Sequence, residues 1–135
     1  MPTRYRDRLQ QESEGHIVMT IDTEERCLLL YPLPAWEEIE NKLAALPSFN
    51  AAARRIQRLL IGHATESELD NQGRILIPPL LREYADIKKN IMLVGQGKKF
   101  EIWDDLHWQA RRGQWLEEKS LGDTELPDDM KTLSL

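Results

Sequence analysis

The sequence predicts an α+β protein built from two copies of one small β-unit, each with short helices attached. Three observations support this prediction. A pattern of segments occurs twice along the chain, each copy holds two short apolar runs separated by a polar turn, and stretches with helical periodicity lie between and after them.

The internal repeat consists of three segments that occur twice in the same order. In the opening segment Pro2 matches Pro78 and Arg6 matches Arg82. One such match is weak, but three in order indicate a duplication in which only the turns have changed length. The matched segments are 1–9 with 77–85, 17–20 with 91–94, and 29–36 with 101–108.

Each repeat combines a Pro-led helical segment with two strand-like runs and a following helix. The runs are IVMTID and CLLLYP in the first repeat, and IMLVGQ and KFEIW in the second. The stretches between them, TEER and GKK, are short and polar, as hairpin turns require. Between the repeats, NAAARRIQRLL has the pattern of a helix capped by Asn50, and HATESELD that of a strand.

These patterns divide the chain into four expected parts. We expect a first unit at 1–36, connecting helices at 37–63, a second unit at 64–108, and a C-terminal helix with an acidic tail at 109–135.

The candidate functional residues lie in the stretch LDNQGRILIPPLLRE. Asp70 and Asn71 are residue types that fold back onto their own backbone, and Gly73 can take the positive φ of a tight turn. If ILIP continues as an alternating strand, Arg74 leaves the turn with its guanidinium outward. Such an arginine can pair with a carboxylate of the protein, here Asp70, or with a phosphate or guanine edge outside it. The spacing leaves both roles open.

The charge distribution leaves nucleic acid open as a partner. The formal net charge is −5, yet acidic residues concentrate near the C-terminus, in EEKSLGDTELPDD. Local patches rather than net charge decide whether a phosphate backbone is attracted. We expect Arg54, Arg55 and Arg58 to form a solvated helix face, with contact to nucleic acid or a neighbouring subunit as the alternative. Further arginines in the first 82 residues are Arg4, Arg6, Arg8, Arg74 and Arg82.

No pattern in the sequence points to catalysis, a metal or a cofactor. His16, His63 and His107 lack metal-ligand spacing, and Cys27, the one cysteine, has no partner for a C-x-x-C pair. We expect Cys27 to pack as a small hydrophobe and His63 to be structural. No apolar run approaches the roughly 18–20 residues of a membrane helix, and a single cysteine fits a cytoplasmic setting.

Together, the turn and the repeats carry a family resemblance. LDNQGRILIPPLLRE followed by IMLVGQGKKFEIWD resembles the D-x-x-G-R signature of SpoVT-AbrB swapped-hairpin domains. CLLLYPLPAWEEIENKL and RRIQRLLIGHATESELD make the chain similar, up to about Trp108, to the MraZ family. The resemblance implies two small swapped-hairpin β-barrel units related by a pseudo-twofold axis.

For function, the resemblance implies a transcriptional regulator of the bacterial division and cell-wall gene cluster. Members of the family form rings and bind promoter repeats, which implies double-stranded DNA and a second molecule of the chain as partners, and a nucleoid location. The DNA-contacting candidates are then Arg74, Gln72 and Asn71, with Asp70 and Gly73 shaping the turn. The alternatives are an antitoxin-like protein-interaction scaffold acting through the acidic tail and, after it, a small-molecule enzyme.

In one respect the chain departs from the family pattern, which has the signature in both units. The second unit has 64–76 upstream of Ile77, whereas the first begins at Met1, the residue that matches Ile77. We therefore expect an N-terminally shortened chain whose first unit lacks a partner for its strand pair. Amides of IVMTID should then exchange earlier than those of IMLVGQ.

Overall fold

The computed structural model describes residues 3–118, which divide after Asp105 into two compact units. Of the acidic stretch expected near the C-terminus, only Glu117 and Glu118 lie within the described residues. No helix in the described range is both long and apolar enough to cross a bilayer.

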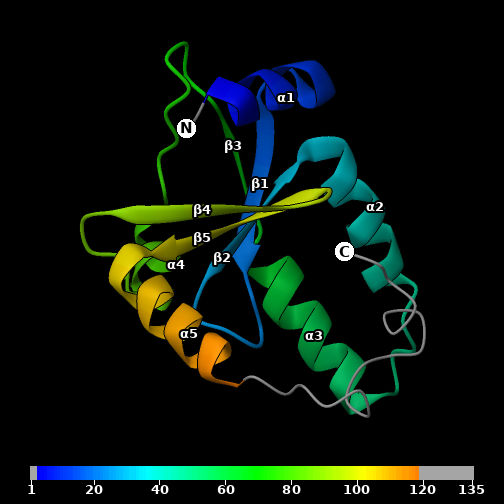
Figure 1. The fold of residues 1–135 in the computed structure, drawn as a ribbon. Helices are drawn as coiled ribbons and strands as arrows, with labels where there is room; N and C mark the ends of the chain where they lie inside the picture. Colours follow the sequence, from blue (N-terminus) through cyan, green and yellow to red (C-terminus); the bar gives the residue numbers. More distant parts are fainter. Residues whose placement is uncertain (1–2, 119–135) are drawn as a thin grey trace, which may run out of the picture. The chain divides into compact units, whose positions relative to one another are not determined.

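The first compact unit is an α+β fold, as the sequence predicts, and holds all five strands described. In chain order its elements are α1 (Thr3–Ser13), β1 (His16–Ile21), β2 (Leu28–Pro32), α2 (Leu33–Ala44), α3 (Ala51–Gly62), β3 (Thr65–Glu68), α4 (Pro79–Tyr84), β4 (Ile91–Gln96) and β5 (Lys99–Asp104) (Figure 1). The second unit holds α5 (Asp105–Glu117), which begins at the last residue of the first.

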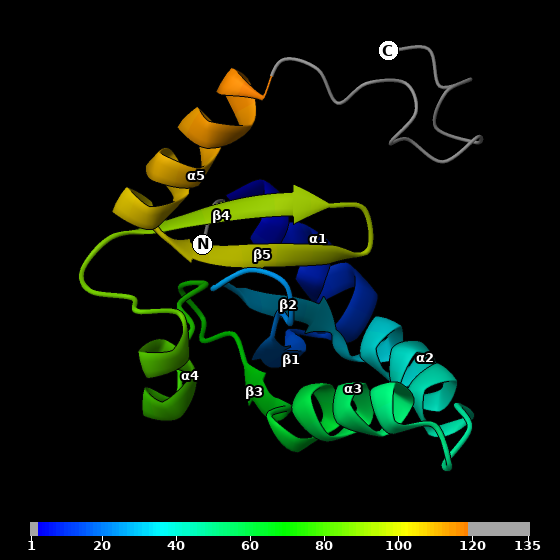
Figure 2. The same ribbon diagram turned by 90° about the horizontal axis from the view of Figure 1, so that it is seen from below.

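The strands form one antiparallel sheet in the order β3-β1-β2-β5-β4, and Figure 2 shows β3 and β4 at its opposite edges. At its centre the two repeats meet. Leu28 pairs with Ile102, and Leu30 pairs with Phe100. Because the repeat aligns Leu28 with Phe100 and Leu30 with Ile102, exchanging the repeats maps this pairing onto itself. The duplicated units are therefore related by a pseudo-twofold axis at the β2–β5 pair.

The hairpins of the two repeats confirm the same symmetry. In the first hairpin Ile17 pairs with Pro32, and in the second Ile91 pairs with Asp104. These are equivalent residues in the sequence repeat. The register of both hairpins thus follows from the duplicated pattern of apolar residues.

Each face of the sheet carries its own apolar cluster. One cluster joins Leu9 of α1 and Leu81 of α4 to the strands. The other joins the strands to α2 and α3 through residues such as Trp36. Both figures show α2 and α3 side by side. Asn50 caps α3 as expected, because its side-chain oxygen accepts a hydrogen bond from the Ala53 amide at 3.1 Å.

One prediction for the second repeat is wrong. ILIP was expected to continue as a strand after the turn, but residues 75–78 are not a strand. Ile75 and Ile77 are half-buried instead, and they pack against the apolar cluster that contains Leu9 of α1 and Leu81 of α4, called the α1–α4 cluster below. A strand needs a neighbour to receive its backbone hydrogen bonds, and no described strand pairs with residues 75–78.

The expectation about which repeat lacks a strand partner is also wrong. β3 precedes the second repeat, but it pairs with β1 of the first: His16 lies opposite Glu68, and Met19 opposite Thr65. β1 is therefore flanked on both sides, by β3 and β2. Among the described strands the two edge strands, β3 and β4, each have a neighbour on one side only, so of the equivalent strands β1 and β4 it is β4 that lacks an outer neighbour.

Candidate nucleic-acid interface

The turn at 70–74 is closed by its own backbone. The Gly73 amide donates to the Asp70 carbonyl at 3.0 Å, and the Asp70 amide donates to the Arg74 carbonyl at 3.1 Å. Gly73 has φ +75°, a left-handed conformation that glycine takes without steric cost. Just before the turn, the Leu69 amide donates to the Gly15 carbonyl at 3.0 Å, which ties the turn to the start of β1.

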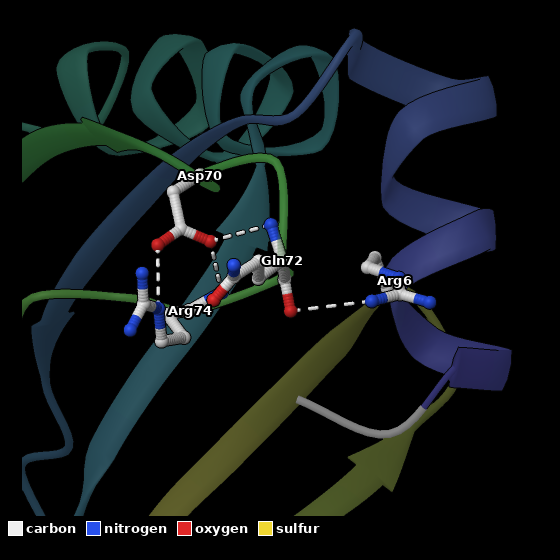
Figure 3. A network of polar contacts seen from close by, with 4 residues as sticks. All are labelled: Arg6, Asp70, Gln72 and Arg74. Atoms are coloured by element: carbon white, nitrogen blue, oxygen red, sulfur yellow. Dashed lines mark hydrogen bonds and ion pairs between the residues drawn. The ribbon is translucent and has the colours of Figure 1, made fainter.

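The Asp70 carboxylate organises the same turn from inside (Figure 3). One of its oxygens accepts from the amides of Gln72 and Arg74, each at 2.8 Å. The other accepts from Nε of Arg74, also at 2.8 Å. These bonds, led by the one from the Arg74 amide, hold the pKa of the Asp70 carboxyl below its ordinary value. The carboxylate therefore stays ionised and fixes the base of the Arg74 guanidinium.

A second arginine, from α1, lies against the turn. Nη1 of Arg6 donates to the Gln72 carbonyl at 3.2 Å, and Figure 3 shows the Arg6 and Arg74 guanidinium groups on either side of the Gln72 backbone. The approach is close, since a Cβ added at Gly73 would lie 2.4 Å from Cδ of Arg6. A glycine at position 73 therefore meets two requirements: it takes the positive φ of the turn, and it leaves room for the Arg6 side chain.

α1 is held over the sheet by residues next to Arg6. The Tyr5 ring packs edge-on against Phe100 of β5, with 4.9 Å between ring centroids. Arg8 donates to the Gly97 carbonyl in the β4–β5 turn. The first helix of the first repeat therefore bridges two turns of the second repeat. This places Arg6 next to residues far from it in sequence.

Of the residues expected to contact DNA, all three lie exposed on this turn. Arg74 both pairs with Asp70 and leaves 72% of its side chain accessible, so the two roles considered for it are compatible. Gln72 and Asn71 are also exposed, and no side-chain hydrogen bond of Asn71 is found within the described part of the chain. Asp70 and Gly73 shape the turn as expected.

Arg6 was not among the expected site residues. The sequence contained one signal, the match of Arg6 with Arg82 in the repeat. That match indicates that an arginine belongs at this place in the helix. It could not show that Arg6 meets Gln72, because the contact depends on how α1 packs across the sheet.

The other groups considered from sequence have local structural roles. Nδ1 of His63 lies 2.7 Å from the Leu59 carbonyl, a contact within the C-terminal turn of α3. Arg54, Arg55 and Arg58 are exposed on α3. Cys27 is buried, as expected of a small hydrophobe.

Within residues 3–118 the fold gathers one set of potential metal ligands that the sequence did not indicate. Atoms of Asp22, Cys27 and Glu101 lie within 4.8 Å of one another. Burial, followed by the nearby Glu101 and Asp22 carboxylates, raises the pKa of the Cys27 thiol. The thiol is thereby kept protonated and lies within hydrogen-bond distance of Asp22, with 3.7 Å between Sγ and Oδ2. These contacts account for the cluster without a bound ion.

A family model matches the chain twice, over residues 1–59 and 60–125, and is described as "MraZ protein, putative antitoxin-like". The chain belongs to the MraZ family. The two matches agree with the duplication, and the family membership expected from the turn signature is confirmed.

Curated relatives carry the name "Transcriptional regulator MraZ". The protein of Coxiella burnetii is 58% identical over 135 residues, which cover 100% of this chain and 89% of the relative. The protein of Legionella pneumophila is 55% identical over the same shares, and that of Halorhodospira halophila 53% identical over 99% and 88%. This is a family of transcriptional regulators, and its name denotes no enzyme class.

Proposed function

We propose that this protein is a sequence-specific DNA-binding transcriptional regulator whose contact with promoter DNA is the turn at 70–74. The main support is Arg74, whose guanidinium is oriented by Asp70 yet is largely exposed at the surface. A guanidinium held in one orientation can bond bidentately to a guanine edge or to a phosphate. An arginine buried in an internal pair could do neither.

The neighbouring side chains fit the same role. Arg6 from α1 adds positive charge beside the turn, and Gln72 and Asn71 bring amide groups to the exposed part of the turn. Contacts from positively charged side chains to DNA phosphates position a protein on the duplex, whereas contacts to base edges specify the sequence. In this proposal Arg74 and Gln72 reach base edges, and Arg6 neutralises a phosphate.

One such turn makes few contacts, so the proposal includes assembly of several molecules into a ring on repeated promoter sites. Linked sites gain affinity because binding of the first raises the effective concentration of the next. Three large apolar side chains of the first compact unit, Phe49, Leu76 and Leu80, are 91%, 83% and 66% exposed. An interface between molecules would cover such surface. Light scattering that finds only a 15.8 kDa monomer at micromolar concentration would exclude the ring.

The DNA contact can be tested by fluorescence anisotropy with a duplex from a division and cell-wall gene promoter and a scrambled duplex of the same composition. Arg74→Ala should weaken promoter binding by about 1–3 kcal/mol per contacting site and reduce the preference for the promoter. Arg6→Ala should weaken binding to both duplexes alike and lower the salt slope by about 1.

Arg55→Ala is the matched control, since Arg55 is an exposed arginine on α3 and should leave both affinities close to wild type. Arg74→Lys separates charge from geometry, because lysine keeps the charge but cannot form the bidentate contact. If Arg74→Ala binds the promoter as well as the parent while circular dichroism shows an intact fold, the turn is not the DNA contact.

A further inference from the structure

α1 and α4 each bond the hairpin of the other repeat from equivalent positions. Arg8 of α1 donates from Nη2 to the carbonyl of Gly97, the residue directly after β4. Tyr84 matches Arg8 in the repeat, and its hydroxyl donates at 2.6 Å to the carbonyl of Asp22, the residue directly after β1. Each helix is therefore fastened to the opposite hairpin by a hydrogen bond, in addition to its apolar contacts in the α1–α4 cluster.

An aromatic contact supports the bond that α1 makes. Tyr5 packs edge-on against Phe100, and the guanidinium carbon of Arg8 lies 5.4 Å from the centroid of the same ring. The Tyr5 phenol lies over Gly95, the β4 partner of Phe100, since a Cβ added at Gly95 would lie 3.3 Å from the Tyr5 hydroxyl oxygen. The equivalent position of the first hairpin holds Ile21. A glycine inside a strand often marks such a close approach.

Arg6 lies between these two anchors on α1. Tyr5 and Arg8 are three residues apart, so they lie on one face of the helix and both contact the β4–β5 hairpin. Arg6 extends from the same helical turn to the Gln72 carbonyl (Figure 3). The two anchors therefore fix the point from which the Arg6 side chain reaches the turn at 70–74.

We propose that Tyr5 and Arg8 are positioning residues for DNA binding. By fastening α1 to the β4–β5 hairpin, they place Arg6 against Gln72 and hold its guanidinium beside the turn that presents Arg74. A side chain that is held in place before binding loses less entropy when it meets a phosphate. The effect of these residues on DNA affinity rests on the proposed function, whereas the coupling of the two turns through α1 does not.

The coupling is tested first without DNA, by NMR of the full chain. Among the described residues neither Tyr5 nor Arg8 has a hydrogen bond to the turn at 70–74, so any effect there has to pass through α1. Tyr5→Ala should move the Gln72 and Gly73 amide signals toward their positions in Arg6→Ala. In the double variant these signals should coincide with those of Arg6→Ala alone. Unmoved signals in Tyr5→Ala would overturn the proposal.

Binding to the promoter duplex is then measured by fluorescence anisotropy over a range of salt concentrations. Tyr5→Ala should weaken binding by about three- to tenfold, as expected of a residue that acts through its neighbour, and should lower the salt slope. Because tyrosine is uncharged, a lower slope means that Arg6 no longer neutralises its phosphate. In an Arg6→Ala background the same substitution should cost less than about twofold. A loss that persists undiminished there would also overturn the proposal.

Tyr5→Phe is the matched control, because it keeps the ring against Phe100 and should bind like wild type. If Tyr5→Ala unfolds, as circular dichroism would show, Arg8→Met gives the same test at a side chain that is 35% exposed. Arg74→Ala distinguishes the two possible failures. If Arg74→Ala weakens binding and Tyr5→Ala does not, the positioning role alone is wrong. If both bind like wild type, the proposed function is wrong and the positioning role for DNA falls with it.

Discussion

Ile17 and Ile91 are isoleucines at equivalent positions of the two repeats, yet Ile17 is 1% exposed and Ile91 is 48% exposed. Both belong to hairpins of equivalent register. The difference lies in the neighbours, because β3 covers the outer edge of β1 and no described strand covers β4. We therefore expect β1 and β4 to contribute unequally to stability. The burial of their side chains depends on whether another strand pairs with their outer edge.

The largest expected effect is a difference between two identical substitutions at the equivalent isoleucines. Ile17→Ala should lower the free energy of unfolding by about 3–4 kcal/mol, since it leaves a cavity in the core, whereas Ile91→Ala should cost less than about 1 kcal/mol. Urea denaturation measures both. If Ile17→Ala is too unstable to study, the pair Ile17→Val and Ile91→Val should show the same order. Equal losses would mean that the β4 edge is covered in solution.

A second comparison concerns two glycines with positive φ, Gly73 at +75° and Gly97 at +68°. Gly97→Ala should cost only the backbone strain of about 1 kcal/mol, because an added Cβ meets nothing within 4 Å. Gly73→Ala should cost about 2 kcal/mol, because its Cβ also collides with Arg6. In an Arg6→Ala background this excess should vanish. Persistence of the excess would show that the strain does not come from Arg6.

Amide exchange without any ligand gives a third comparison. Ile91 and Leu93 should exchange at least about tenfold faster than Ile17 and Met19, because only the β1 amides are bonded to a neighbouring strand on that side. This is the reverse of the order expected from the sequence. Mass spectrometry or NMR can measure it at low protein concentration. Slower exchange in β4 than in β1 would contradict the pairing described above.

The smallest effect is the pH dependence of the turn. The folded-state pKa of Asp70 lies below its ordinary value of 3.8, so the Asp70–Arg74 contacts stabilise the turn above pH 3.8. They are lost as the pH falls through the lowered pKa. NMR titration should show the Gln72 and Arg74 amides shifting with the Asp70 carboxyl. Arg74→Ala keeps the amide bond to Asp70 but removes the guanidinium, so the midpoint should move up part of the way toward the ordinary value. An unchanged midpoint would show that the Arg74 side chain does not lower the pKa of Asp70.

Local features of the fold could be predicted from the sequence because short-range chemistry determines them. Asn50 caps α3 through its own side chain, and Asp70 with Gly73 closes the turn within a few residues. The hairpins also follow, since their register depends on neighbouring residues and on the alternation of apolar side chains. The sequence alone therefore determined the class, the repeat and the exposed turn that presents Arg74.

Only the tertiary structure decided which segments meet across the sheet. That β3 pairs with β1 of the other repeat, that residues 75–78 form no strand, and that Arg6 lies on Gln72 all depend on contacts between residues far apart in the chain. A strand pattern specifies which side chains face the core, but its open hydrogen-bonding edge accepts any strand of suitable register. The choice among partners is made by the packing of the whole sheet, which is why equivalent isoleucines end in different surroundings.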